Sequence, residues 1–394
     1  MLSNKLANGI EFVYIPAKTF YNTVAIGTKS GFSFDPADKP GLTHLYEHVL
    51  ISMLNKLYKY GENVEKSGFS QNAFTYNGAM VIYFEQQKNK ILKTLKLFKN
   101  IIENFYISND VFEIEKEAVK NESSDHNKDY DSVVLDFVKL RGFASGRNTR
   151  VETIESINKL SMLDVLKWHS TVFSNNGIIV ILYGDVVYSD YENMKILLSS
   201  IRLNDYVKPK YPKIKKTNNT GVKKISNRLK KLDTGIFAFN IKNPTFTDYL
   251  CERIYKDTMI DYDDSLLFDF IRNRERASYT AYYNDIDGVG ERVFYFSFAS
   301  RNKRNLVKTM NTVKNPKTFF RQNEGLFKKG KKRALLKFYG DASNQSDFSV
   351  DLAYYYILYG KILDIYKIRN RLLSIKYADY IKWLNRLKYK KIII

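Results

Sequence analysis

The chain has 394 residues, of which 44% are hydrophobic, and this length favours two or three packed domains over one core. The net charge of +21 is spread along the sequence without a helix–turn–helix, finger or RNP-like motif, so nucleic-acid binding would rest on charge alone and is not expected. The single cysteine, Cys251, excludes an internal disulfide and fits a reducing, cytoplasmic location. Neither a membrane-spanning segment nor an export or import signal is predicted.

The first half of the sequence alternates strand-like and helical patterns. In chain order it predicts two strands in 5–15 about an Asn8-Gly9 turn, a strand in 22–35, a histidine-bearing helix at 41–50, a hairpin in 68–85 that turns at Asn77-Gly78, a helix in 91–105, an acidic helix in 111–125, a helix in 161–173 that opens with Ser161 and Asp164 as a weak capping box, and a buried strand in 177–185.

The pattern fails at 204–224, which holds two prolines and many polar residues and is predicted to be an interdomain linker. After it, 232–242 predicts a strand and 249–260 a helix, so a strand–helix order appears on both sides of the linker. We therefore expect an α+β fold of two similar domains, 1–203 and 225–394, each a mostly antiparallel sheet packed with helices.

The segment "GLTHLYEHVL" (41–50) holds two of the four histidines in the chain. On a helix, residues four apart share one face, so His44 and His48 can direct two imidazole nitrogens at one point. Glu47 lies on the same side, as a zinc hydrolase requires of its carboxylate base. The order H-x-x-E-H inverts the commoner H-E-x-x-H and is the inverzincin signature.

A catalytic zinc site wants a third protein ligand, which the acidic helix at 111–125 can supply. Glu115 and Glu122 are seven residues apart, two helical turns, and share a face. Glu117 is expected to point elsewhere, whereas periodicity does not exclude Glu113. The spacing therefore leaves the identity of the third ligand open.

These motifs resemble the M16 (insulinase, pitrilysin, mitochondrial processing peptidase) metalloprotease family. "HLYEH" and "EKEAVKNE" are similar to its metal motif, and "SQNAFTYNGAMVIYF", "VILYGDV" and "LLFDFIRNRERASYTAYY" follow in the family's order. The resemblance implies His44, His48 and Glu122 as zinc ligands, Glu47 as general base and Glu115 as a supporting residue. His126 and His169 match no ligand of the family and are expected to be surface or structural residues.

The resemblance also implies where a peptide would be held. Asn72, Ala73 and Phe74 match an edge strand beside the zinc, to which an extended substrate adds as a further strand. Arg272 and Tyr279 match a pair that faces the zinc across a closed chamber and holds the substrate and the oxyanion. Two further candidates for the arginine stay open, Arg274 and Arg276.

The expected function is that of a zinc-dependent endopeptidase that cleaves peptides or unfolded leader segments. The length matches the short two-domain members of the family, each a half-clamshell, so the chamber requires a homodimer or a heterodimer with a related chain. Two alternatives stay open: a noncatalytic chamber subunit that partners another peptidase chain, and a basic nucleic-acid-binding protein.

Overall fold

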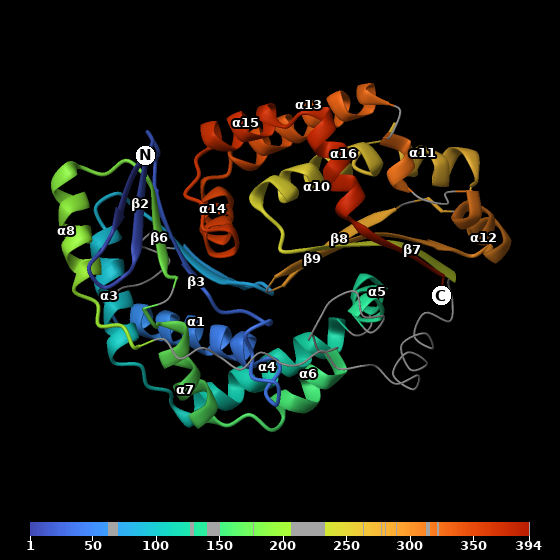
Figure 1. The fold of residues 1–394 in the computed structure, drawn as a ribbon. Coiled ribbons are helices and arrows are strands. Elements are labelled where there is room, and N and C mark those ends of the chain that lie inside the picture. The colour runs from blue at the N-terminus through green and yellow to red at the C-terminus, as the bar shows by residue number, and fades with distance from the viewer. Residues whose placement is uncertain are drawn as a thin grey trace. The chain divides into compact units, whose positions relative to one another are not determined.

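The structure is a computed structural model, and it divides the chain into two compact units (Figure 1). The first unit comprises Met1–Ser124, Val151–Pro212 and Asp341–Asp364, and the second comprises Asp125–Arg150, Lys213–Gly340 and Ile365–Ile394. The residues that the structure describes are 1–61, 70–126, 130–139, 150–175, 177–205, 233–262, 264–276, 278–279, 281–288, 290–312, 316–320 and 323–393. The predicted linker at 204–224 lies outside them, apart from Asn204 and Asp205.

The first unit contains a six-stranded sheet and its covering helices. Its elements are β1 (Leu2–Lys5), β2 (Glu11–Pro16), β3 (Asn22–Thr28), α1 (Leu42–Gly61), β4 (Ser70–Thr75), β5 (Met80–Gln86), α3 (Ile91–Glu103), α4 (Asn109–His126), α6 (Arg150–Ile157), α7 (Met162–Val172), β6 (Ile179–Gly184), α8 (Tyr188–Ser199) and α14 (Gln345–Tyr359).

The strands of this sheet run in the order β1-β2-β6-β3-β5-β4, so β4 lies at one edge and β1 at the other. Only β2 and β6 pair in parallel, and every other neighbouring pair is antiparallel. The parallel pair is possible because the chain returns to β2 only after a long excursion through α1 to α7. The prediction of a mostly antiparallel sheet is confirmed.

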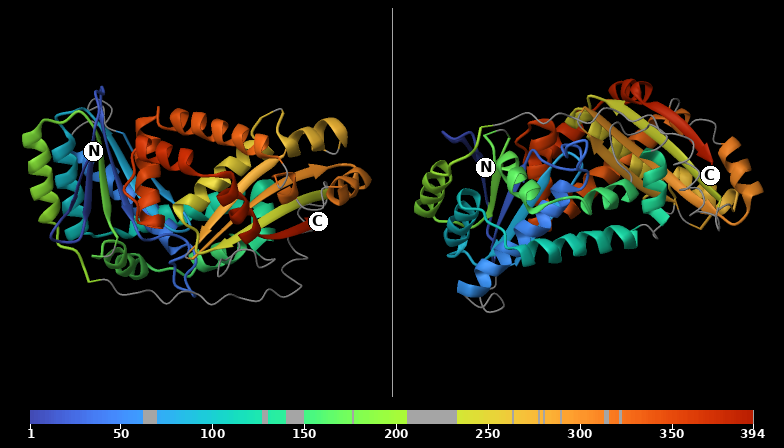
Figure 2. Two further views of the ribbon diagram at one scale, coloured as in Figure 1. Left: turned by 45° about the horizontal axis from the view of Figure 1, so that its top comes forward. Right: turned by 90° about the horizontal axis from the view of Figure 1, so that it is seen from below.

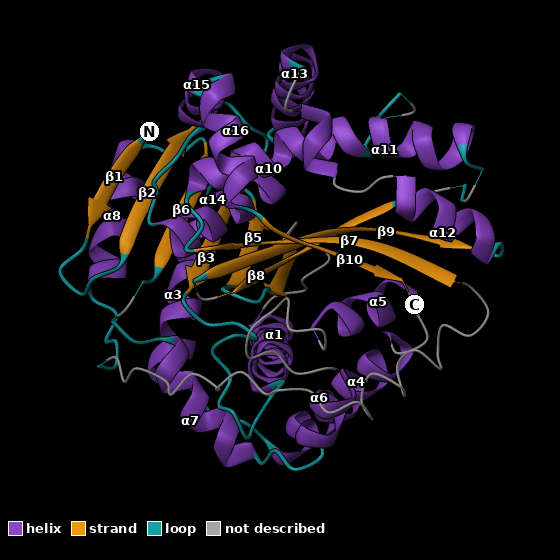
Figure 3. Cartoon of the chain, turned by 45° about the vertical axis from the view of Figure 1, so that its right-hand side comes forward, coloured by secondary structure: helices purple, strands orange, loops and turns teal. Residues whose placement is uncertain are grey.

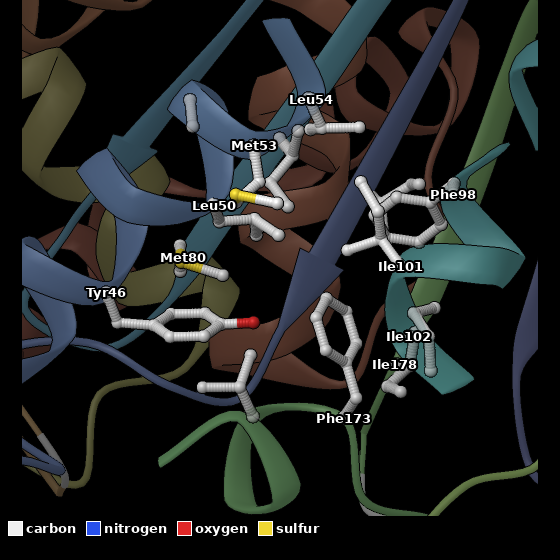
Figure 4. Close-up of a cluster of buried hydrophobic side chains, with 14 of the residues drawn as sticks. Tyr46, Leu50, Met53, Leu54, Met80, Phe98, Ile101, Ile102, Phe173 and Ile178 are labelled. Atoms are coloured by element: carbon white, nitrogen blue, oxygen red, sulfur yellow. The ribbon is translucent and has the colours of Figure 1, made fainter. Parts of the chain in front are cut away.

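One face of the sheet and the helices α1, α3 and α7 enclose the main hydrophobic core of the unit (Figure 4). From α1 the buried side chains recur at helical spacing: Leu42, Leu45, Tyr46, Val49, Leu50, Met53 and Leu54. They meet apolar residues of β5 and α3, such as Met80, Phe98 and Ile102. This packing fixes which side of α1 is left for polar groups.

The other face of the sheet is covered by α14, a helix from near the end of the sequence (Figure 2). It packs on β3, β6 and β5. Gly27 on β3 permits the close approach, because a Cβ added there would lie 3.2 Å from the Cβ of Ala353 and 3.1 Å from Ile179 Cγ2. The central strands of the sheet, β3 above all, are therefore buried on both faces.

The second unit contains a four-stranded antiparallel sheet in the order β10-β7-β9-β8 (Figure 3). Its elements are α5 (Tyr130–Val138), β7 (Asp233–Lys242), α10 (Phe246–Met259), α11 (Leu266–Asp269), the π-helical turn η3 (Phe270–Arg274), β8 (Tyr282–Gly288), β9 (Glu291–Ser300), α12 (Lys303–Thr312), the 3-10 turn η4 (Pro316–Phe320), α13 (Glu324–Asp341), α15 (Ile365–Ser374), α16 (Tyr377–Arg386) and β10 (Lys388–Ile393).

This second sheet is also covered on both faces. One face packs on α5 through Val134, Phe137 and their neighbours. The other carries aromatic residues that meet α10 and α16: the rings of Phe239 and Tyr255 lie 5.5 Å apart, and Trp383 stacks on Phe294 at 6.3 Å. The expected α+β fold with a helix-packed sheet in each half is confirmed.

The predicted elements of both halves are present, and the capping box of Ser161 and Asp164 is formed in full. One feature was not expected. The units exchange helices, since α5 of the first half joins the second unit and α14 of the second half joins the first. The predicted domain ranges, 1–203 and 225–394, remain a proposal, and the compact units differ from them by this exchange.

Among the described residues no helix is both long and apolar enough to cross a membrane.

Candidate metal centre

The first turn of α1 is held by Asp35, a buried residue of the preceding loop. Its carboxylate accepts hydrogen bonds from Gly41 N at 2.7 Å, Thr43 N at 2.9 Å and Thr43 Oγ1 at 2.6 Å. These donors include main-chain N–H groups that a helix start leaves without a partner. Burial raises the pKa of Asp35 to about 7, and the Thr43 and Gly41 donors oppose that rise. Asp35 thus fixes the position of the turn that carries His44.

His44 and His48 lie on the polar side of α1, next to each other. Their ring centroids are 4.8 Å apart, and the rings are nearly perpendicular at 86°. Glu122 reaches them from α4: its Oε2 is 3.7 Å from His44 Nε2 and 3.4 Å from His48 Nε2. One ligand atom from each of the three residues lies within 4.8 Å of the other two.

Glu115 lies two helical turns before Glu122 on the same face of α4 and contacts the other nitrogen of His48. Its Oε2 is 3.3 Å from His48 Nδ1. A hydrogen on Nδ1 would donate to this carboxylate and leave the Nε2 lone pair for a metal ion. A carboxylate that orients a metal-binding histidine in this way is a recurrent feature of zinc sites.

The donor set fits a zinc ion. Bonds of about 2.0–2.1 Å in a tetrahedron separate neighbouring ligand atoms by about 3.3 Å, close to the spacings of Glu122 from the two imidazoles. With the hydrogen of His48 on Nδ1, its Nε2 lone pair and the Glu122 carboxylate are both acceptors, and they lie 3.4 Å apart. A cation placed between them would satisfy both. His44, His48 and Glu122 are therefore the residues that would hold zinc.

Glu47 lies beside this cluster and is 9% exposed. Burial raises its pKa, while the hydrogen bond from Thr75 and the neighbouring His48 lower it. Thr75 Oγ1 donates to Glu47 Oε2, which ties the carboxylate to the end of β4. A largely buried carboxylate next to a metal-ligand cluster has the surroundings of a general base.

The three residues predicted to bind substrate lie on β4, the edge strand. Asn72 is exposed, Ala73 is buried and Phe74 is 36% exposed, the alternation of a strand with one covered face. The Ala73 N–H donates to Asn72 Oδ1 at 2.9 Å. A main-chain donor that bonds to a side chain of its own strand is one that β5 does not use, so it is available to an added strand.

Arg272 and Tyr279 belong to the second unit, and the structure brings them together. The Arg272 guanidinium carbon lies 4.4 Å from the centroid of the Tyr279 ring, a cation–π contact, and Tyr279 is 72% exposed. Arg272 is part of the π-helical turn η3, a form that often marks functional sites. Of the competing arginines, Arg274 pairs with Asp269 at 2.9 Å, and Arg276 has a positive φ of 48°.

The remaining acidic and histidine candidates are accounted for differently. Glu117 pairs with Lys120 at 2.6 Å, away from the cluster as expected, and Glu113 is exposed and is not in the cluster. His169 is a structural residue: Tyr46 Oη lies 2.8 Å from its Nδ1, and its Nε2 donates to Ile102 O at 2.9 Å. The side chain of His126 lies outside the described part of the chain.

The sequence interpretation gave no role to Asp35, and it included Thr75 in the edge strand without its bond to Glu47. Strand parity could have signalled Thr75, because residues two apart on β4 share a face and Ala73 was already placed beside the metal site. Asp35 gave a weaker signal: an acidic residue a few positions before a predicted helix start is a common cap.

The chain matches two family models. The model described as "Insulinase (Peptidase family M16)" matches residues 15–151, and the one described as "Peptidase M16 inactive domain" matches residues 159–316. The first match contains the histidine pair, Glu47, the edge strand and both acidic residues, and the second contains Arg272 and Tyr279.

Individual proteins show the same relationship. The chain is 25% identical to the mitochondrial-processing peptidase subunit beta of Saccharomyces cerevisiae over 173 residues, 42% of this chain and 37% of that protein. It is 24% identical to the insulin-degrading enzyme of Mus musculus over 227 residues, 53% of this chain and 22% of that protein. It thus spans well under half the length of these relatives.

The fold extends the similarity to the whole chain. A protease from Helicobacter pylori superposes with a TM-score of 0.78 at 18% identity, covering 100% of this chain and 98% of that one. At this identity the superposition is evidence of a shared fold and of nothing more. The two family models, which together cover most of the chain in the expected order, show that the protein belongs to the M16 (insulinase) peptidase family.

Proposed function

We propose that this protein is a zinc-dependent endopeptidase that cleaves peptides or unfolded segments in an extended conformation. The observation that carries the proposal is the convergence of His44, His48 and Glu122 within 4.8 Å of one another. Glu47 lies on the same helix, largely buried and hydrogen-bonded. Membership of the M16 family gives the same reading of the four residues.

The chain's own residues would divide the reaction among them. Zinc, when bound, would supply a Lewis acid that polarises water and the peptide carbonyl. Glu47 would accept the proton of the attacking water and return it to the leaving amine. Its Oε2 is engaged by Thr75, so the proton would be carried on Oε1. Tyr279 and Arg272 would donate to the oxyanion and to the substrate.

The edge strand would hold the substrate. An added strand would pair with β4 through the outward main-chain groups at Ala73 and displace the Asn72 side chain from the Ala73 N–H. Main-chain pairing tolerates many sequences but requires an unfolded segment. This supports a peptide, a precursor or a leader sequence as the substrate class.

Metal analysis and a single conservative variant test the proposal. The purified protein should hold about one zinc per chain. Glu47→Gln should keep that zinc and its thermal stability while the turnover of a fluorogenic peptide falls by at least about 100-fold. The double variant His48→Ala/Glu122→Ala should lose the zinc. Full zinc occupancy in the double variant, or turnover of Glu47→Gln close to wild type, would contradict the assignment.

The same experiment decides the alternative that the chain is a noncatalytic chamber subunit. The description of the second matched model as an inactive domain motivates this alternative. A noncatalytic subunit would show no turnover above that of Glu47→Gln under any condition. It would stimulate hydrolysis only when mixed with a related, active chain.

We propose further that the active unit is a dimer of this chain or a heterodimer with a related chain. Glu47→Gln lacks the base and Arg272→Ala lacks the substrate-holding group, so each alone should be nearly inactive. If Arg272 acts on the partner's metal centre, mixing the two variants gives hybrids with one complete site and restores about a quarter of wild-type activity. No recovery after proven subunit exchange would place Arg272 in the same chain's site or require a different partner.

A further inference from the structure

Thr75 is the last residue of β4, and it connects the edge strand to Glu47. Its hydroxyl donates to Glu47 Oε2. The orientation of the carboxylate therefore depends on where the end of β4 lies. Glu47 is 9% exposed, which leaves water little access to replace this donor.

The strand itself is anchored to α1 at two points on the same face. Thr75, Ala73 and Gln71 alternate with the exposed positions Asn72 and Phe74. Near the other end of the strand, Gln71 Nε2 donates to Asn55 Oδ1 of α1 at 2.8 Å. Side chains of β4 therefore tie the strand to the helix that carries His44, Glu47 and His48.

This arrangement matters because β4 is also the strand to which a substrate would add. A glutamate has three rotatable side-chain bonds, so without a fixed partner its carboxylate would sample several orientations next to the metal ligands. A base that is misplaced by about 1 Å can lose on the order of 100-fold in rate. A hydrogen bond that fixes Oε2 keeps Oε1 in one place relative to a peptide on β4.

We propose that Thr75 is a positioning residue for the general base, so that the strand that binds the peptide also orients the carboxylate that cleaves it. The proposal rests on the proposed function, because it assigns Glu47 as the base. Thr75 itself is not expected to touch the reacting atoms.

Two substitutions at Thr75 separate positioning from packing. Thr75→Val keeps the size and the β-branched shape but removes the hydroxyl, whereas Thr75→Ser keeps the hydroxyl. Thr28→Val is the matched control: Thr28 ends β3, which β5 separates from β4, is buried and bonds to Ser30 Oγ at 2.8 Å rather than to Glu47. Zinc content, thermal stability, kcat and KM are measured for all three variants and the wild type.

Thr75→Val should lower kcat by about 10- to 100-fold, with KM within about two-fold of wild type and zinc unchanged. Thr75→Ser should return kcat to within about three-fold of wild type. Thr28→Val should lower thermal stability without a comparable loss of kcat. A merely structural role for Thr75 would lower stability or zinc content in proportion to activity and would not move kcat alone.

Three results would overturn the positioning role: kcat of Thr75→Val within about two-fold of wild type, Thr75→Ser as slow as Thr75→Val, or a loss of kcat that follows a loss of zinc. Each of these requires an active wild type, so the proposed function would survive them. Wild-type turnover equal to that of Glu47→Gln would instead overturn the proposed function and the role of Thr75 together.

Discussion

Each unit contains a cluster of ionisable side chains built on one of its helices, and the two clusters differ in whether they include a cation. In the second unit, Glu252 of α10 is 2% exposed and forms two bonds with Arg292 of β9, Nε–Oε2 at 2.6 Å and Nη2–Oε1 at 2.7 Å. Asp285 and Asp287 of β8 also contact this guanidinium. In the first unit, α1 presents His44, Glu47 and His48, and α4 adds Glu115 and Glu122.

The difference lies in the source of the cation. The second unit supplies its own positive charge, a guanidinium whose planar donors match a carboxylate in two places. The first unit gathers carboxylates around the imidazoles of His44 and His48, and a neutral imidazole can bind a metal ion. A cluster that contains its own cation serves as scaffold, and one that an added cation would complete can serve as a binding site. We expect substitutions in the two clusters to have correspondingly different effects.

The largest effect is expected from removing the internal cation of the second unit. Arg292→Met would leave Glu252 buried without its partner and should destabilise the protein by about 3–5 kcal/mol in urea denaturation. Arg274→Met is the matched control: the Arg274 side chain is 70% exposed and pairs with Asp269. The control should cost at most about 1 kcal/mol. A loss at Arg292 no larger than that of the control would mean that the buried network does not hold the unit together.

A second comparison contrasts the buried His169 with the histidines of the metal-ligand cluster. The contribution of His169 should appear in the pH dependence of stability. Burial lowers the pKa of His169 from 6.5 to about 4, so the neutral ring is the folded form. Between these values the unfolded chain binds a proton that the folded chain does not, and stability falls as the pH drops from 6.5 toward 4. The contribution of His169 should shrink by about 2 kcal/mol between pH 7.5 and pH 5.

The contribution of His169 is isolated by subtraction, because other groups of the chain also respond to pH. Denaturant unfolding of the metal-free wild type and of His169→Gln is measured at both pH values. The variant should be less stable at pH 7.5, and the gap between the two proteins should narrow at pH 5. A gap that stays constant with pH would show that His169 does not titrate between the two.

The last comparison tests the residue that supports the metal-ligand cluster of the first unit. Glu115→Gln should weaken zinc binding by about 10- to 100-fold, because the carboxylate that orients His48 through Nδ1 is lost. The ligand set itself stays complete, so the metal should still bind, as measured by competition with a chromophoric chelator. Glu113→Gln on the same helix is the control and should leave the affinity unchanged. Equal affinities of the two variants would remove the supporting role of Glu115.

The sequence predicted the local part of the candidate site well, because helical geometry is fixed over a single turn. Residues 44 and 48 must share a face of any helix that contains them, and Glu47 must lie close by. The same reasoning places Glu115 and Glu122 on one face of α4. It could not choose among the acidic residues of that helix, and the resemblance to the M16 family pointed to Glu122 instead.

Tertiary structure decided which groups from distant segments reach the site. The orientation of α4 against α1 brings Glu122 to the imidazoles and leaves Glu113 exposed. Asp35 and Thr75 act through hydrogen bonds to residues 8 and 28 positions away in the sequence, and no periodicity encodes such partners.

The exchange of α5 and α14 between the units shows most clearly what sequence patterns cannot predict. Spacing of apolar residues identified strands and helices, and the four-residue spacing of His44 and His48 identified the histidine pair. These features depend on backbone geometry and on neighbours within a few residues. An apolar helix face, however, specifies only that it must be buried, and it is compatible with either sheet. Shape complementarity, such as the close approach of Ala353 to Gly27, exists only after the chain has folded, and it is what assigns α14 to the sheet of the metal centre.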